Sequence, residues 1–345
     1  MTRKRIVFRL LICAALFFFL TLAILLVFNN RILSKNHPID ADELVIEGWL
    51  PAYILEQIPQ KMDLSRYKTI FVTGIAYKHP PIDERQYELT SIPAVLSGNG
   101  CLGLTKATLE KIKPTSSLNE ISLFVYGSKA LNKFAHFFVV AGDSIIGQAF
   151  VSDQPQKYVF RTGLSLTRAE GIFVYYNNDL RTSTEDRNLI VDSISINGKV
   201  FNKPSDFFKL YDSKVDINLF SNYPFQSKAT VTAAYLKALG INNKIITIDT
   251  FYNKRNRTLV AAKRFNSYIN RYSKDVSAFN IISVPKHSRR SYLSYKVATF
   301  GRKEVGIISL NYMAFNRKTR TKEWLRYITL EYAKIFIMTI QYLLS

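Results

Sequence analysis

The segment Gly171–Gly198, which reads GIFVYYNNDLRTSTEDRNLIVDSISING, decides the fold of the middle of this 345-residue chain. Its two apolar runs, Val174–Tyr176 and Leu189–Ile196, are rich in β-branched and aromatic residues. Such runs, bounded by polar and glycine residues, predict β-strands. The segment therefore predicts two strands that flank a polar turn.

Hard oxygen ligands gather in that turn: Asn177, Asn178, Asp179, Glu185, Asp186 and Asn188. Carboxylates, amide oxygens and turn carbonyls suit calcium, which takes six to eight oxygens in flexible geometry. The spacing differs from that of the helix-flanked calcium loop. From the residues alone, a calcium site and a solvated polar hairpin both remain open.

A family resemblance favours the calcium site. The turn and the strands around it resemble the calcium-dependent xylan-binding carbohydrate modules over about a quarter of the chain, in Asn178-Asp179, Asp186-Arg187-Asn188-Leu189, Asp192-Ser193-Ile194, Asn197-Gly198, Ile121–Gly127, Phe137–Gly142 and Gln156–Phe160. The resemblance implies that residues 118–201 form an inserted, jelly-roll-like all-β sandwich. It also implies a calcium ion that chelates sugar hydroxyls directly. Asp179 and Asp186 would be its carboxylate ligands, with Asn178 and Asn188 lending oxygens or orientation, while Arg187 is interpreted as a supporting or surface ion pair.

The N-terminus predicts a membrane anchor. Residues Leu10–Phe28 are apolar over almost the length needed to cross a bilayer, and no small-residue cleavage site follows them. The basic residues Arg3, Lys4, Arg5 and Arg9 precede this run. The positive-inside rule therefore predicts a single-pass protein of the inner membrane, with its bulk on the periplasmic side. Residues 1–39 would be a cytoplasmic stub, a transmembrane helix and a tether.

The net charge is +21, and it is concentrated in the C-terminal part of the chain. Residues 251–326 hold eighteen Lys or Arg against three acidic residues. A basic surface attracts phosphates, including those of anionic lipids and phosphorylated carbohydrate. We expect no nucleic-acid partner, because an exported, anchored protein rarely meets one; solvated helix faces near anionic lipid are the simpler alternative. The two cysteines, Cys13 and Cys101, predict no disulfide.

Residues 40–117 and 202–345 predict an open α/β framework around the insert, with a Rossmann-like, mostly parallel sheet. The expected strands are Glu43–Ile46, Thr69–Val72, Lys244–Ile248, Phe279–Val284 and Val305–Leu310. The expected helices are Ala52–Met62, Gln226–Leu239, Lys254–Tyr272, Arg289–Thr299 and Lys322–Leu344. We expect the last helix to pack on the sheet rather than against a membrane.

Open α/β sheets bind ligands at the carboxyl ends of their strands, so the residues there are the candidates for a second site. The candidates are Glu47, Gly48, Gly74, Arg257, Thr258, His287, Arg289 and Arg290. The glycines would let a ligand approach the backbone, and the cations would bind an anion at a helix N-terminus. His287 and Glu47 are the candidate acid/base pair. The simpler interpretation gives each of these residues a turn, a cap or an ordinary ion pair.

Several sequence motifs of this framework also resemble the SanA, YdcF and ElyC family of envelope proteins. They are VIEGWLP at Val45–Pro51, VTG at Val72–Gly74, NRT at Asn256–Thr258, PKHSRRS at Pro285–Ser291 and VGIISL at Val305–Leu310. The resemblance implies a Rossmann-like fold linked to envelope integrity and to lipid-carrier or peptidoglycan metabolism.

Two functions follow from these observations. The first is a membrane-anchored envelope protein that binds carbohydrate through calcium and acts on or binds a phosphorylated or lipid-linked glycan, as a hydrolase or transferase. The second is a non-catalytic polysaccharide-binding sensor. No nucleophile motif is present in the sequence to decide between them.

Overall fold

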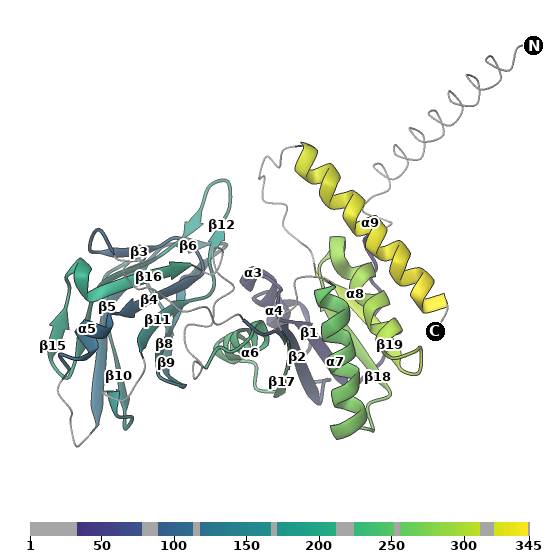
Figure 1. The fold of residues 1–345 in the computed structure, drawn as a ribbon, viewed down its shortest axis with the longest axis horizontal. Coiled ribbons are helices and arrows are strands. Elements are labelled where there is room, and N and C mark those ends of the chain that lie inside the picture. Colours follow the sequence, from purple (N-terminus) through teal and green to yellow (C-terminus); the bar gives the residue numbers. More distant parts are fainter. Residues whose placement is uncertain are drawn as a thin grey trace, which may run out of the picture.

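The computed structural model describes residues 33–77, 89–112, 118–166, 171–211, 224–251, 256–310 and 321–343, and side chains within the last range from Thr329 onward. These residues form an α/β body and a β-sandwich that lie side by side (Figure 1). The predicted transmembrane segment and Cys13 lie outside the described residues. No helix in the described ranges is long and apolar enough to cross a membrane.

Five parallel strands form the central sheet of the α/β body, in the order β17-β2-β1-β18-β19. This confirms the predicted parallel sheet. The strands were readable from sequence because a parallel sheet covered on both faces needs apolar runs. Their bounds are β1 (Glu43–Glu47), β2 (Thr69–Ile75), β17 (Lys244–Thr250), β18 (Ala278–Ser283) and β19 (Glu304–Ser309).

Helices cover both faces of this sheet. Side chains alternate in direction along each strand, so each face of the sheet packs against its own set of helices. Leu44 and Ile46 pack in one core with α6 and the short helices that follow β1, whereas Val45 packs in the other core with α7 and α8. Helix α9 packs on α8. The helices are α3 (Ala52–Leu55), α4 (Ile58–Lys61), α6 (Lys228–Ala238), α7 (Arg257–Tyr272), α8 (Pro285–Ala298) and α9 (Thr321–Leu343).

The predicted single helix over residues 52–62 is wrong. Two four-residue helices, α3 and α4, occupy this range. Pro59 lies in the first turn of α4, where a proline is tolerated, but it has no backbone N–H to continue a helix from α3. Glu56 is the residue that caps the C-terminus of α3 at this break.

The β-sandwich has two antiparallel sheets. One has the order β10-β5-β14-β15, with β3 paired to β14, and the other has the order β16-β4-β11-β8-β9. The sandwich thus takes strands from both sides of the predicted range 118–201, namely β3, β4 and β16. The bounds are β3 (Ala94–Leu96), β4 (Gly100–Leu104), β5 (Asn119–Gly127), β8 (His136–Ala141), β9 (Ser144–Phe150), β10 (Gln156–Thr162), β11 (Ile172–Tyr176), β14 (Leu189–Ile196), β15 (Lys199–Phe201) and β16 (Phe207–Tyr211).

Short elements complete the insert: β6 (Lys129–Ala130), β7 (Lys133–Phe134), β12 (Leu180–Arg181), β13 (Asp186–Arg187), the helix α5 (Lys106–Leu109) and the 3-10 turn Pro204–Asp206. Strands β12 and β13 pair as a hairpin that projects from the sandwich (Figure 1). This hairpin contains the polar turn on which the calcium prediction depends.

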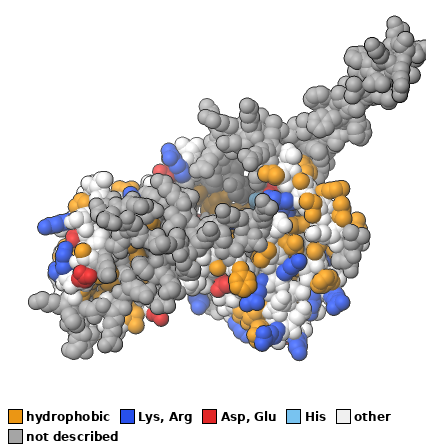
Figure 2. Space-filling view, in the orientation of Figure 1, with side chains coloured by type: hydrophobic (Ala, Val, Ile, Leu, Met, Phe, Trp, Pro, Cys, Tyr) orange, Lys and Arg blue, Asp and Glu red, His pale blue; other side chains and the backbone are white. Residues whose placement is uncertain are grey.

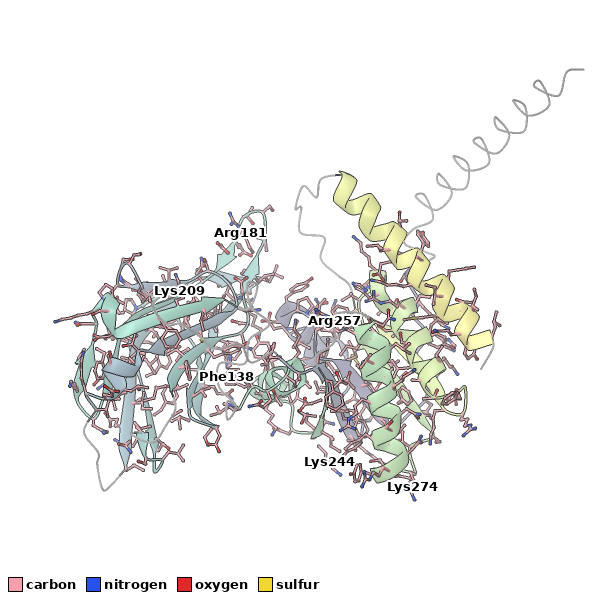
Figure 3. The ribbon with its side chains drawn as sticks, in the orientation of Figure 1. Phe138, Arg181, Lys209, Lys244, Arg257 and Lys274 are labelled. Carbon is pink, nitrogen blue, oxygen red and sulfur yellow. The ribbon has the colours of Figure 1, made fainter. Side chains whose placement is uncertain are left out.

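The two parts of the molecule share one hydrophobic core. Phe138, Phe173 and Phe208 of the sandwich lie in the same cluster as Leu44 and Ile46 of the α/β sheet. Figure 3 shows Phe138 on the side of the sandwich that faces the α/β body. A shared apolar core makes the insert an integral part of the fold rather than a loosely tethered module.

Part of the predicted tether is also integral. Leu33 is buried, and the backbone of His37 exchanges hydrogen bonds with Ile307 of β19 at 2.8 and 2.9 Å. Asn280 of β18 bonds both backbone groups of Ile39. Residues 33–39 therefore lie against the α/β body, and the expectation of a free tether there is wrong.

Candidate functional site

The polar turn is a two-stranded ribbon with two distinct faces. Leu180 pairs with Arg187 and Arg181 pairs with Asp186 across β12 and β13. Side chains alternate along a strand, so Leu180 and Arg187 project to one face, and Arg181 and Asp186 project to the other.

Asp186 is the predicted calcium ligand on the second face, and the predicted ligands Asp179 and Asn188 directly flank the two strands. Burial, followed by the charge of Asp179, raises the pKa of the Tyr176 hydroxyl, and Asp186 acts in the same direction. Asn188 Oδ1 is buried and accepts no hydrogen bond from the described residues. Two carboxylates and an amide oxygen without a hydrogen bond, all from one short ribbon, are the ligand types that a hard divalent cation takes.

The donor set is sparse in side-chain carboxylates. Within the described ranges, no three acidic, histidine or cysteine side chains gather closely enough to hold a metal ion. An ion at the ribbon would therefore need amide, backbone or ligand oxygens to complete its shell. Calcium accepts such ligands readily.

The sequence predicts that Asn178 lends the metal an oxygen or orientation, and in the structure its side-chain oxygen is bonded to the backbone of His136. The Asn178 side chain is fully buried and its hydrogen bonds are committed elsewhere. Asn178 Oδ1 accepts from the backbone N–H of His136 at 2.7 Å, and Nδ2 donates to the Phe134 carbonyl at 3.0 Å and to the Tyr235 hydroxyl at 3.2 Å. Asn178 therefore fixes the sandwich to helix α6.

Arg187, which the sequence predicts to be a supporting or surface ion pair, forms a supporting one with a partner that the sequence did not indicate. It is fully buried, and its Nη1 donates to Glu56 Oε1 at 2.7 Å. Further bonds run to the carbonyls of Asn178 and Ala130, and Tyr235 OH donates to the same Glu56 oxygen at 2.6 Å. The first face of the ribbon is thus bound to the α/β body by a buried ion pair, while Asp186 projects from the second face.

A second polar cluster lies at the carboxyl ends of β1 and β18, where the strand order of the sheet reverses and ligands bind in open α/β folds. Glu47 is buried there, and its Oε2 accepts from Ser291 Oγ at 2.7 Å and from Ser283 Oγ at 3.2 Å. Burial raises the pKa of Glu47, and the bond from Ser291 and the charge of Arg290 offset only part of this rise. Glu47 is thereby suited to hold a proton that a free glutamate would lose.

His287 lies near this cluster and contacts Trp49 and Glu331. Its ring meets Trp49 edge to face with centroids 4.9 Å apart, and its Nδ1 lies 3.6 Å from Glu331 Oε2. Burial alone would raise the pKa of Glu331, but hydrogen bonding to His287 and the charge of Arg290 outweigh it and set the pKa at about 2. Glu331 is thus a fixed anion that orients His287 and Arg290. It lies on α9, which the sequence did not connect to the site.

A pocket of about 230 Å³ brings three predicted anion-binding residues together. Arg257, Thr258 and Arg290 line it with Asn256, Lys334 and Met338. Arg290 Nη1 and Lys334 Nζ both donate to Glu331, at 2.5 and 3.0 Å. Because these two cations share the single carboxylate of Glu331, the pocket keeps a positive charge.

Arg289 does not line this pocket. Its charge, together with that of Lys296, lowers the pKa of Lys35, although burial is the larger cause of that shift. Arg289 therefore belongs to a different basic cluster, near the start of the described chain.

At Gly48 and Gly74, where the sequence predicts that a ligand approaches the backbone, helix α6 makes a close approach, and Gly48 also lines a pocket. A Cβ on Gly74 would meet the backbone nitrogen of Ala229 at 2.3 Å, and one on Gly48 would meet backbone atoms of Lys228 at 2.9 Å. Both glycines thus let the first turn of α6 approach the sheet. Helix α6, rather than a ligand, occupies the space.

A smaller pocket of about 120 Å³ lies between the two parts of the molecule. Trp49 and Lys228 line it from the α/β body, and Asn99 and Asn177 line it from the sandwich. Asn99 Oδ1 accepts the backbone N–H of Asp179 at 2.8 Å. The pocket is thus connected to the ribbon through Asn99 and to His287 through Trp49.

The comparisons with known proteins concern mainly the sandwich. Residues 120–209 match the family model described as a Ca-dependent, xylan-binding carbohydrate-binding module. No curated protein matches the chain. Among solved structures, a module of this kind in complex with galactobiose is 22% identical with a TM-score of 0.20, covering 24% of this chain and 66% of its own.

Two further structures are similar to parts of the chain. A selenomethionine form of the same module, described in connection with circular permutation between two calcium-dependent module families, is 23% identical with a TM-score of 0.19, covering 24% of this chain and 60% of its own. An acetyl xylan esterase from the rumen bacterium Butyrivibrio proteoclasticus is 10% identical with a TM-score of 0.22, covering 73% and 76%. The chain spans less than two thirds of the length of the two modules. Residues 120–209 are thus a β-sandwich region similar to calcium-dependent, xylan-binding carbohydrate-binding modules, as the sequence predicted.

Proposed function

We propose that the chain binds carbohydrate through its β-sandwich, with a calcium ion held by Asp179, Asp186 and Asn188. The observation that carries this proposal is the ribbon, which brings Asp179, Asp186 and Asn188 into one short hairpin and leaves the buried Asn188 Oδ1 without a hydrogen bond from the described residues. The family match over residues 120–209 supports it. A bound calcium ion would supply coordination positions for sugar hydroxyls, since these are neutral oxygen ligands.

Retention on immobilised polysaccharide tests this function. Xylan and galactobiose are the first ligands to try, because the matched module family and one similar structure name them. We expect the unchanged chain to be retained, and a chelator to abolish this retention. The double variant Asp179→Asn, Asp186→Asn should not be retained. Asp153→Asn, which removes an exposed carboxylate of the same sandwich, is the matched control and should be retained normally.

The proposal extends to the α/β body, where we assign the basic pocket to the phosphate of a phosphorylated or lipid-linked glycan. Arg257, Arg290 and Lys334 supply its charge, and the N-terminus of α7 adds backbone N–H groups. Glu47 and His287 would donate or accept protons nearby, since burial favours a protonated Glu47.

Measurements of phosphate binding and of glycan turnover distinguish an enzyme from a non-catalytic sensor. Arg257→Gln should weaken binding of inorganic phosphate, whereas Lys237→Gln, an exposed charge change on α6, should not. If the body is an enzyme, His287→Gln abolishes turnover of a phosphorylated glycan and leaves phosphate binding in place. If the unchanged chain binds phosphate but turns over no such glycan, the non-catalytic sensor is the correct function.

The membrane anchor and the periplasmic location belong to the same proposal. They depend on the apolar run Leu10–Phe28 and on the basic residues before it. The resemblance to the SanA, YdcF and ElyC family stays a prediction that agrees with this placement. Protease added to intact spheroplasts should digest the body; protection from the protease would contradict the proposed topology.

A further inference from the structure

Helix α9 presents an apolar face to its surroundings. Its inner side is fixed by Glu331, Ile335 and Met338, which are buried. The opposite side carries Phe336, Ile337, Ile340 and Leu343, exposed by 67, 55, 41 and 75%. The helix, which the sequence predicts to pack on the sheet rather than against a membrane, packs on α8 and leaves these four apolar side chains exposed.

This face is unusual because a helix on a protein surface normally turns charged and polar residues outward. From Thr329 to Leu343 the only charged residues are Glu331 and Lys334, and both belong to the ion-pair cluster of the basic pocket. Figure 2 shows hydrophobic side chains gathered over the upper right of the molecule, where α9 lies, with Lys and Arg side chains beside them. A contiguous apolar surface of this kind marks an interaction site.

The residues next to the C-terminal half of α9 extend the face. Tyr342 packs near Gly301, and the adjacent Phe300 is 60% exposed. The guanidinium of Arg302 lies 5.9 Å from the centroid of the Phe300 ring. Apolar and aromatic groups bordered by arginine and lysine are the composition of a surface that lies in the headgroup region of a bilayer.

The chain enters the α/β body beside the helix that supports α9. The backbone N–H of Lys35 donates to Ser288 Oγ of α8 at 2.7 Å, and Lys35 Nζ lies 3.2 Å from the centroid of the Tyr292 ring. The apolar run that ends at Phe28 precedes Leu33 by only five residues. Five residues reach at most about 18 Å, so a bilayer crossed by that run would lie close to α8 and α9.

We propose that the outer face of α9 lies in the interface of an anionic phospholipid bilayer, as a second membrane contact beside the N-terminal segment. Charge favours this occupant: a net charge of +21 is attracted to anionic lipid and opposes pairing with a second copy of the same chain. This inference goes beyond the proposed function. It places the pocket of Arg257 and Lys334, on the flank of the same helix, at headgroup level, where a lipid-borne phosphate would be met.

Environment-sensitive fluorescence on the full chain tests the proposal. We would attach a nitrobenzoxadiazole probe at Ile337→Cys in a Cys13→Ser background, leaving the buried Cys101 in place, and reconstitute the chain in phosphatidylglycerol-containing vesicles. The matched control is a probe at Lys237→Cys, an exposed position on α6 across the sheet. A third chain carries the probe at the native Cys13 and reports whether the N-terminal run inserts.

The probe at position 337 should show blue-shifted emission and lose most of its fluorescence to nitroxide-labelled lipid. The probe at position 237 should respond only to an aqueous quencher. The proposal is overturned if the 337 probe behaves like the 237 probe, whether or not the Cys13 probe is in lipid. It is also overturned if the 337 probe is shielded from both quenchers in a chain that sediments as a dimer. Circular dichroism confirms that each labelled chain is folded.

Discussion

The buried pair Arg187 and Glu56 should contribute more to stability than any surface ion pair of the sandwich. Arg187 is fully buried and Glu56 is 5% exposed, with 2.7 Å between Nη1 and Oε1. At that distance the attraction in a protein interior with an effective dielectric constant of about 20 is roughly 6 kcal/mol, most of which offsets the cost of removing two charges from water. Removing one partner leaves the other charge buried without neutralisation.

We therefore expect Glu56→Gln and Arg187→Met each to lower the free energy of unfolding by about 3 to 5 kcal/mol. The double variant should lose less than the sum of the two, because it buries no uncompensated charge. The matched control is Arg161, whose pair with Glu120 spans 3.4 Å on the surface of the same sandwich. Arg161→Met should cost less than about 1 kcal/mol.

Urea denaturation, followed by circular dichroism and by the fluorescence of the two tryptophans, Trp49 and Trp324, measures these differences. Because Glu56 and Trp49 lie in the α/β body and Arg187 lies in the sandwich, both signals should change together. If the Arg187 and Arg161 variants lose equal stability, or if the two signals separate in the unchanged chain, the reasoning about a shared, rigidly bound interface is refuted.

Three further predictions follow from single contacts. Burial lowers the pKa of His136 from an ordinary value near 6.5 to about 4, so the folded state favours the neutral ring. Up to roughly 3 kcal/mol of stability should therefore be present above pH 6.5 and be lost as the pH falls toward 4. His136→Gln should flatten this pH dependence of the free energy of unfolding in denaturation curves. Gly74→Ala should cost about 1 to 3 kcal/mol by pushing α6 from the sheet, as thermal denaturation would show, whereas Gly163→Ala, with nothing within 4 Å of its Cβ, should have little effect. Asn178→Ala should lower stability, whereas Asn188→Ala should mainly lower calcium affinity in a titration; the reverse pattern would show that their roles have been exchanged.

The strands of the α/β body could be predicted from sequence because their apolar composition is a local property. Residues 279–283 and 305–309, for example, read as buried strands without any knowledge of their neighbours. The margins of the sandwich could not be predicted in this way. Strand β4 reads GCLGL, and β3 has only three residues, so neither carries a clear alternating pattern.

The roles of individual polar residues were harder to predict, because they depend on partners distant in the chain. Arg187 and Glu56 are 131 positions apart, and nothing local distinguishes a buried arginine from an exposed one. The charged cluster at Glu331 likewise depends on how α9 packs on α8. Only the break at Pro59, which places Glu56, had a local signal.

Gly48 and Gly74 illustrate the same limit. A glycine at the end of a strand indicates a close approach, but the sequence does not say whether a ligand or a helix makes it. In this chain, α6 makes it at both positions.

The most direct test of the central claim is a crystal structure of the chain soaked with calcium and a xylo-oligosaccharide, with the anomalous signal used to locate the ion. The account predicts one ion that bridges Asp179 and Asp186, accepts Asn188 Oδ1 as a ligand and completes its shell with sugar hydroxyls. Two carboxylates that point apart into solvent, with no ion between them at millimolar calcium, would contradict it.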